Sequence, residues 1–271
     1  MKIPKIFIYL SYLAGLLTIL LSWQGITNPN TYKLETLNWA TQAIGQDYIN
    51  LFIAVPLLFI SAYLTKQGSF KAFLVWLGLL LYLVYSYIIY AFFIHFSPLF
   101  LVYVAALSLS FYSLLGALVN INYSEITGIF KNIKVKAVSI FLVIIAGIFY
   151  FLWLSEIINA LVNKQVPASL LGTGLITNPV HVLDLAFLLP GVLIVSQLLR
   201  QRKILGLILA VPIMLFLVVM GLAIISIMIL MAPNFYSTLP QELMIFLIVL
   251  LNLFFIGRYF KKLNSVLVSV K

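Results

Sequence analysis

Residues 200–231 read RQRKILGLILAVPIMLFLVVMGLAIISIMILM, a basic turn followed by an unbroken run, from 204 to 231, without a charged side chain. A membrane-spanning helix needs about 20 predominantly apolar residues, so this run is long enough to cross a bilayer. The basic turn before it predicts the orientation, because Lys and Arg are enriched in short cytoplasmic segments. This stretch therefore predicts a membrane helix that starts at the cytoplasmic face.

The composition of the whole chain also indicates a membrane protein. Of the 271 residues, 64% are hydrophobic and 8% are charged, whereas charged residues make up about a quarter of a soluble domain. The net charge of +10 is accounted for by short basic turns and implies no nucleic-acid partner. Cysteine is absent, which excludes disulfides, iron–sulfur clusters and thiol catalysis. Any metal would need nitrogen and oxygen ligands.

Seven further apolar stretches have the length of a membrane span. The eight expected spans are residues 6–23, 48–64, 72–94, 99–119, 137–155, 180–199, 204–231 and 243–257. Fourteen of the 16 Lys and Arg residues lie in alternate gaps between them, leaving Lys33 and Lys164 on the other side. We therefore expect an all-α integral membrane protein with eight transmembrane helices and both termini cytoplasmic.

The absence of organellar targeting signals favours the plasma (inner) membrane of a bacterium or archaeon. The first apolar stretch is read as an uncleaved helix, because it exceeds a signal-peptide core and no A-x-A site follows. Cleavage between residues 23 and 30 would leave the other seven helices oriented identically. Eight helices are compatible with a monomer, with a homodimer and with a complex with another membrane protein.

The two halves of the chain resemble each other when residue 47 is aligned with residue 181. This alignment places Asp47 over His181, Asn50 over Asp184 and Pro56 over Pro190. We expect a 4+4 parallel tandem repeat with halves 1–135 and 136–271, related by an axis along the membrane normal. Chance resemblance between apolar helices is the alternative.

The residues suited to proton transfer or cation binding gather at the predicted outer face. Both histidines, His95 and His181, lie there, together with all the acidic residues except Glu125. Helix-start chemistry explains some of these acids without a function. Residues 238–241 resemble a capping box ahead of Glu242, and Asp47, after Gly45 and Gln46, is read as a helix cap or a site residue.

Asp184 is the strongest candidate for a binding site. Asn178 and Pro179 read as a cap followed by proline at the first helical position, so Asp184 lies about 9 Å further along the helix. An ionised acid entering hydrocarbon costs at least about 2.5 kcal/mol, so it should face the bundle interior, a wet cavity or a partner. His181 is the expected partner, because residues three apart share a helical face. A buried His–Asp bond that only fixes helix packing is the alternative.

Three more candidates accompany this pair. Asp47 and Asn50 form the matching wall of the expected site, and Glu156 lies where the fifth span is expected to leave the membrane, as a site residue or a solvated interfacial acid. Pro56 and Pro190 should kink or loosen their helices, since each removes a backbone donor. Carbonyls freed in this way line ion and substrate sites in interrupted transporter helices.

A metal site is the alternative use of these residues. His181, Asp184 and either His95 or Asp47 would offer the nitrogen and oxygen ligands that suit Zn, Mn or Fe, although their spacing is not specific. The hydroxyls of five tyrosines need partners in a dry bundle, and interfacial belts, interhelical hydrogen bonds or a cavity lining would each supply them. These tyrosines are Tyr82, Tyr85, Tyr87, Tyr90 and Tyr103.

Residues 178–190, NPVHVLDLAFLLP, together with Gly45, Gln46 and Asp47, resemble segments of an uncharacterised family of multi-pass bacterial membrane proteins. The resemblance covers the second to fourth and the sixth expected spans. It implies a membrane-embedded fold, implies no activity, and transfers no role to any residue.

These observations lead to three functional hypotheses. The first is a non-enzymatic membrane protein whose outward-facing acidic and histidine site binds or transports a cation, protons or a small polar solute. The second is a metal-dependent or redox enzyme that acts on a lipid or isoprenoid at the outer leaflet. The third is a sensor or assembly partner of another membrane protein. No nucleotide-binding motif or catalytic elbow occurs in the sequence.

Overall fold

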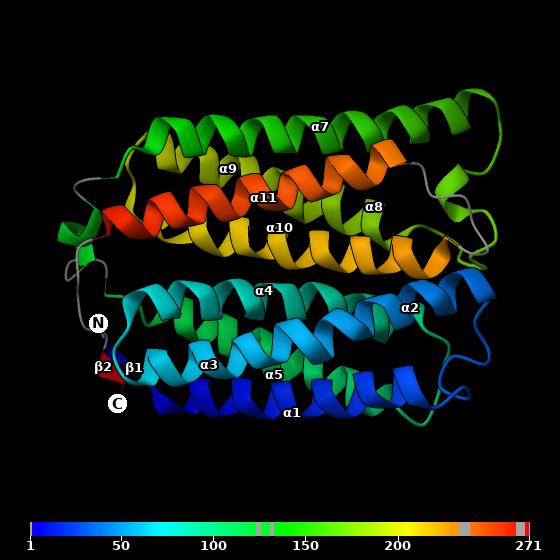
Figure 1. Cartoon of the computed structure of the whole chain (residues 1–271), viewed down its shortest axis with the longest axis horizontal. Helices are drawn as coiled ribbons and strands as arrows, with labels where there is room; N and C mark the ends of the chain where they lie inside the picture. The colour runs from blue at the N-terminus through cyan, green and yellow to red at the C-terminus, as the bar shows by residue number, and fades with distance from the viewer. Residues whose placement is uncertain (1, 123–125, 131–132, 233–238, 264–268, 271) are drawn as a thin grey trace.

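A computed structural model describes residues 2–122, 126–130, 133–232, 239–263 and 269–270. Within these residues, eight helical spans are long and apolar enough to cross a membrane. They run side by side along the long axis of the molecule (Figure 1). The expected all-α fold with eight helices of membrane length is thus confirmed.

Short interruptions divide two of the spans into several elements. The second span comprises α2, η1 and α3, and the sixth comprises α8, η4 and α9. The elements are β1 (Lys2–Ile3), α1 (Lys5–Thr27), α2 (Leu37–Ile49), η1 (Asn50–Ala54), α3 (Val55–Lys66), α4 (Phe70–Phe93), α5 (Phe100–Val119), η2 (Thr127–Phe130), α7 (Val135–Val162), η3 (Ala168–Leu170), α8 (Pro179–Leu183), η4 (Asp184–Leu188), α9 (Leu189–Arg200), α10 (Ile204–Met231), α11 (Leu239–Lys262) and β2 (Ser269–Val270).

Helices α4 and α10 form the centre of the molecule. The first four spans lie together in one part of Figure 1 and the last four in the other, and α4 packs against α10 where the two parts meet. Gly78 of α4 permits this close packing, because a Cβ at this position would lie 2.9 Å from the Pro212 carbonyl oxygen. Most of α4 is therefore buried, and polar side chains on it have protein neighbours on several sides.

Both ends of the chain lie at the same end of the bundle. Strand β1 pairs in parallel with β2, with Lys2 opposite Ser269 and Ile3 opposite Val270. The turns after α3 and α9 lie at this end as well (Figure 1). The opposite end, which we call the loop end, carries residues 28–36, 94–99 and 163–178. The acids and histidines predicted to face outward lie at or near the loop end.

The second span begins at Leu37, well before the start at residue 48 that the hydropathy pattern predicted. Thr36 caps α2, its hydroxyl accepting a hydrogen bond of 3.2 Å from the Trp39 amide. The prediction that Asp47 caps this helix is therefore wrong, because Asp47 lies about 15 Å along the helix from its first residue. Residues 37–47 were missed because they are mostly polar or small, although Trp39, Ala43 and Asp47 share a buried face.

Glu156 also lies within a helix and not at its end. Helix α7 continues to Val162, past the boundary expected at residue 155, because residues 156–162 mix polar and apolar side chains without a helix breaker. The predicted cap at Asn178 is confirmed, since its Oδ1 accepts from the Val180 and His181 amides at 2.9 and 3.3 Å. The capping box expected at Thr238 lies outside the described residues.

Both interrupted spans contain a π-helical turn at matching positions. The η1 turn begins at Asn50 and ends two residues before Pro56, and the η4 turn begins at Asp184 and ends two residues before Pro190. In each turn the backbone widens by one residue, so the Val55 amide bonds to the Asn50 carbonyl and the Leu189 amide to the Asp184 carbonyl. Such turns occur frequently at functional sites. Each one here starts at a buried polar residue.

Candidate functional site

Asp47 is buried and accepts hydrogen bonds from two tyrosines. It is 1% exposed. The Tyr32 hydroxyl, from the loop before α2, donates to Oδ2 at 2.5 Å, and the Tyr90 hydroxyl of α4 lies 3.0 Å from Oδ1. The Tyr90 hydroxyl also lies 3.0 Å from the Ala43 carbonyl oxygen, so its single proton can be donated to either acceptor.

Helix α1 closes over the Asp47 carboxyl group. A Cβ added to Gly25 would collide with Asp47 Oδ2 and would lie 2.8 Å from the Tyr32 hydroxyl. Only a residue without a side chain therefore fits at position 25. The position of Asp47 is fixed from three directions, by α1, by the loop before α2 and by α4.

The Tyr32 phenol remains protonated at neutral pH. Its burial, followed by the negative charge of Asp47, raises its pKa well above the usual value near 10. The hydroxyl is therefore a permanent hydrogen-bond donor to Asp47. The sequence analysis missed Tyr32 because it lies in a loop. No pattern in the sequence indicated that its side chain returns to the bundle.

Below Asp47, polar side chains continue along the contact between α2 and α4. Gln46 Nε2 donates to Ser86 Oγ at 2.7 Å, and the Tyr82 hydroxyl donates to Asn50 Oδ1 at 2.8 Å. Tyr82, Ser86 and Tyr90 are spaced four residues apart and so lie on one face of α4. The spacing of this polar stripe is visible in the sequence, although its partners are not.

Several polar atoms around Asp47 are buried without a hydrogen-bond partner among the described residues. They are Ser22 Oγ, Asn50 Nδ2 and the hydroxyls of Tyr87 and Tyr103. Ser22 and Asn50 lie beside the Asp47 carboxyl group, and the Tyr103 ring stacks on Tyr90 with centroids 5.4 Å apart. A buried polar group without a partner costs about 1–3 kcal/mol. Each has a polar neighbour close by, Asp47 for Ser22 and Asn50, Thr18 for Tyr87 and Tyr32 for Tyr103, so small side-chain rotations would pair them.

Asp184 forms a second buried centre, 5% exposed. The Tyr85 hydroxyl donates to Oδ1 at 2.9 Å, and the Trp153 indole nitrogen of α7 donates to Oδ2 at 2.8 Å. Tyr85 and Tyr90 both belong to α4, so this helix supplies hydrogen-bond donors to both buried acids. The prediction that Asp184 faces the bundle interior is consistent with this geometry.

His181 is oriented towards Glu156 and Trp153. Its Nε2 lies 3.7 Å from Glu156 Oε2, and its ring lies 4.7 Å from the Trp153 ring, centroid to centroid. The expected hydrogen bond to Asp184 does not appear among the contacts of the described residues, where the His181 ring faces Glu156 and Trp153 instead. Glu156 Oε1 accepts from the Ser169 amide at 2.7 Å, which connects this pair to the loop at residues 163–178.

Asp184→Asn tests the Trp153 contact. An asparagine side chain offers one acceptor oxygen, so Tyr85 and Trp153 cannot both keep their bonds, and one donor left unpaired costs about 1–3 kcal/mol. We expect a folded protein with a lower melting temperature in detergent. Trp153→Phe is the matched variant. The double variant should be less destabilised than the sum of the two singles, and additive effects would contradict the contact.

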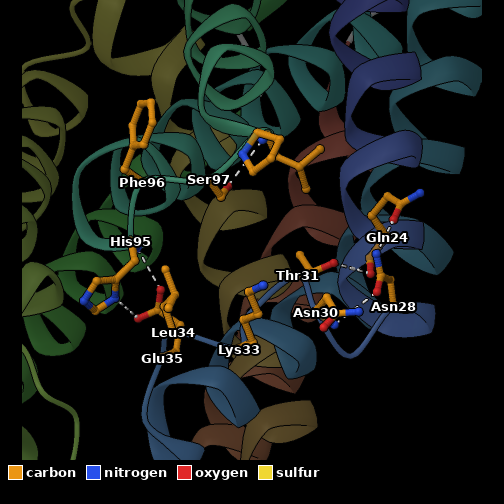
Figure 2. Close-up of a pocket in the computed structure, with 12 residues that line it drawn as sticks. Gln24, Asn28, Asn30, Thr31, Lys33, Leu34, Glu35, His95, Phe96 and Ser97 are labelled. Carbon is orange, nitrogen blue, oxygen red and sulfur yellow. Dashed lines mark hydrogen bonds and ion pairs between the residues drawn. The ribbon is translucent and has the colours of Figure 1, made fainter.

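His95 lies in a pocket at the loop end (Figure 2). Glu35 accepts from the His95 backbone amide at 2.7 Å and contacts its Nδ1 at 2.9 Å. The pocket has a volume of about 530 Å³ and lies between residues 28–36 and the turn before α5. Its lining residues are Gln24, Asn28, Asn30, Thr31, Lys33, Leu34, Glu35, His95, Phe96, Ser97, Pro98 and Leu99.

The candidate metal ligands do not form a cluster in the described part of the chain. No group of three His, Asp or Glu side chains there is arranged to hold a metal ion. His95 is engaged with Glu35, and the oxygens of Asp184 already accept two hydrogen bonds. The transition-metal site therefore remains a prediction from sequence.

Elemental analysis of the detergent-purified protein, with an absorption spectrum, tests the metal hypothesis. We expect less than stoichiometric Zn, Mn and Fe, because no three His, Asp or Glu side chains in the described part of the chain are arranged to hold a metal ion. About one equivalent of metal that disappears in both His181→Ala and Asp184→Asn would contradict this expectation. It would favour the enzyme hypothesis.

The structure thus brings Asp47 together with Asn50, and His181 with Glu156, around two buried carboxyl groups that share α4. The partners that sequence reasoning missed are Tyr32 and Trp153, and it left the tyrosines of α4 without assigned partners. Comparison of the chain with models of protein families, with curated proteins and with solved structures finds no match.

Proposed function

We propose that this chain is a non-enzymatic plasma-membrane transporter that couples the movement of a small polar solute to protons or a monovalent cation. Asp47 is the group that exchanges the proton. The observation that carries this proposal is the arrangement of Asp47, Tyr90 and the Ala43 carbonyl, in which Tyr90 lies 3.0 Å from both acceptors.

This arrangement accommodates both protonation states of Asp47 without an unpaired donor. When Asp47 is ionised, Tyr90 donates its proton to Oδ1. When Asp47 is protonated, its O–H donates to the Tyr90 oxygen, and Tyr90 donates to the Ala43 carbonyl. Rotation of one hydroxyl exchanges the two patterns, and Tyr32 continues to donate to Oδ2 in both. A buried acid whose ionised and protonated forms are both hydrogen-bonded is suited to repeated binding and release of a proton.

The charge around Asp47 supports the same proposal. Among the described residues, Asp47 has no ion-pair partner, and an ionised carboxylate inside a bundle is expensive without one. A proton or a monovalent cation would neutralise the charge. The buried hydroxyls of Ser22, Tyr87 and Tyr103 near Asp47 are oxygen ligands of the kind that hard cations prefer.

The two π turns support a tandem-repeat origin of the site. The alignment of the two halves that the sequence suggested also relates the first residues of the turns, Asn50 and Asp184. In this proposal the halves 1–135 and 136–271 are parallel repeats, and their interrupted helices line the pathway. In this proposal Asp184 remains ionised while Asp47 exchanges its proton. The donors around it, Tyr85 and Trp153, suit an ionised carboxylate.

The proposed orientation places the loop end outside the cell. Fourteen Lys and Arg residues lie on the side of the predicted cytoplasmic turns, and the positive-inside rule assigns that side to the cytoplasm. Both termini then lie in the cytoplasm, and the pocket of Figure 2 faces outward. A solute would enter from the loop end and meet Asp47 beneath it.

Reconstitution into liposomes that contain a pH-sensitive dye tests the proposal. Monocarboxylates, amino acids and sugars are added in turn, under a pH gradient and under a sodium gradient, with protein-free liposomes as the control. We expect at least one solute class to move protons or to enter with sodium in a protein-dependent manner. Folded protein that moves neither ion with any of the three classes would contradict the proposal.

A further inference from the structure

The pocket at the loop end has the size and lining of a solute site. Its volume of about 530 Å³ falls within the roughly 300–1,000 Å³ of small-molecule pockets. Residues 24–31 line one side with amides and a hydroxyl, and Leu34, Phe96 and Leu99 add apolar surface. Figure 2 shows Lys33 between the amide side and the pair formed by Glu35 and His95. Polar and apolar groups therefore converge on one space.

Lys33 determines the charge that this pocket accepts. It is the only Lys or Arg among the lining residues, and none of the described acidic residues forms an ion pair with it. Glu35, the one acid of the lining, is held by two contacts to His95 at 2.7 and 2.9 Å. An ammonium group that pairs with no described acid, in a pocket whose carboxylate is already engaged, is complementary to an anion.

The polar groups opposite Lys33 are largely paired with one another. Asn28 Nδ2 donates to Gln24 Oε1 at 3.1 Å, and the Thr31 hydroxyl donates to the Gln24 carbonyl at 2.8 Å. These bonds hold the side of the pocket formed by residues 24–31 in place and leave Lys33 as the main binding group. We propose that the pocket binds a small organic monocarboxylate, with its carboxylate on Lys33 and its apolar part against Leu34, Phe96 and Leu99.

Tyr32 connects this pocket to Asp47. It lies between Thr31 and Lys33 in the chain, and its own side chain is buried against Asp47. The loop is held by turn bonds on both sides, from the Thr31 amide to the Asn28 carbonyl and from the Glu35 amide to the Tyr32 carbonyl, each 3.0 Å. Because Lys33 and Tyr32 are neighbours in this loop, the proposed coupling between a bound carboxylate and Asp47 runs through these two residues. This coupling step rests on the proposed function, whereas binding in the pocket does not.

The binding test uses the full chain in detergent, titrated with lactate and benzoate and with their neutral analogues lactamide and benzamide. We expect the two carboxylates to raise the melting temperature progressively as their concentration rises above the dissociation constant, and the amides to leave it unchanged. Lys33→Gln should weaken carboxylate binding about tenfold or more, the effect of losing one charge-assisted hydrogen bond. The matched control is Lys164→Gln, which removes the other outer lysine and should bind like the wild type.

Three results would overturn the assignment: no stabilisation by either carboxylate, equal stabilisation by the amides, or equal binding by Lys33→Gln and the wild type. Stabilisation by phosphatidylglycerol alone would also overturn it, because Lys33 would then serve a lipid phosphate.

Tyr32→Phe separates the coupling from the binding. It should bind carboxylates like the wild type but lose the proton movement that carboxylates drive in liposomes, and wild-type proton movement would overturn the coupling. Carboxylate binding through Lys33 without any ion movement in liposomes would refute the proposed function and leave the pocket standing. Ion-coupled transport without carboxylate binding would refute the pocket assignment and leave the proposed function standing.

Discussion

Asp47→Asn is expected to fold like the wild type and to lose proton-coupled flux about 100-fold or more, the loss expected when an essential proton-transfer group is removed. The amide should resemble the protonated form of the acid. Its Nδ2 donates to the Tyr90 oxygen, Tyr90 donates to the Ala43 carbonyl, and Tyr32 donates to the amide oxygen. The variant therefore keeps the hydrogen bonds of one state and cannot reach the other.

Proton movement in dye-loaded liposomes measures this effect, and the melting temperature in detergent reports on folding. Glu242→Gln, the same chemical change at the start of α11, is the control and should retain the wild-type flux. Wild-type proton flux in Asp47→Asn would refute the role of this residue. A large fall in the melting temperature would refute the hydrogen-bond pattern from which the role is inferred.

Gly25→Ala is expected to disrupt the packing of α1 against Asp47. The new Cβ would collide with Asp47 Oδ2, so α1 must move away from α2 or Asp47 must leave its two tyrosines. Overpacking of this kind typically costs about 1–3 kcal/mol. Displacement of the carboxyl group would also remove the proton coupling.

Gly147→Ala is the matched control for this variant. Gly147 lies within α7, and a Cβ there would meet no atom within 4 Å, so the alanine should stabilise the helix by about 0.5–1 kcal/mol. We expect the melting temperature to fall in Gly25→Ala and to remain equal or rise in Gly147→Ala. Equal stability of the two variants would show that α1 does not close over Asp47 in the way described.

The sequence predicted the helices better than it predicted their boundaries and contacts. Apolar length identified all eight spans, and the seventh matches α10 at both ends. The start of the second span was misplaced because hydropathy reads only apolar residues, whereas residues 37–47 form a helix that buries one face, including Trp39, and is capped by Thr36. This helix moves Asp47 from the expected helix end to a position within the span.

The burial of the candidate residues was predicted better than the partners that they contact. Asp184 was chosen because an acid within an apolar helix needs a partner, His181 because it shares a helical face with Asp184, and Asp47 and Asn50 because they align with this pair. All four are buried. Their partners lie far away in the chain. Trp153 is 31 residues from Asp184, and Tyr85 is 99 residues from it. Such contacts depend on how whole helices pack, which local periodicity does not encode.

For the two interrupted helices, the sequence predicted the position of an irregularity but not its type. The prolines at 56 and 190 indicated an irregularity in each helix, and the structure places a π turn before each proline. A proline is also compatible with a simple kink. The widened turn, which begins at Asn50 in one span and at Asp184 in the other, could not be distinguished from a kink before the structure was known.

The most direct test of Asp47 as the exchanging group is infrared difference spectroscopy between acidic and alkaline pH, on the wild type and on Asp47→Asn in lipid. A protonated carboxyl group has a carbonyl stretching band that its ionised form lacks. The account predicts that acidification produces such a band for a buried acid in the wild type and that this band is missing in Asp47→Asn. Identical difference spectra from the two proteins would contradict proton exchange at Asp47.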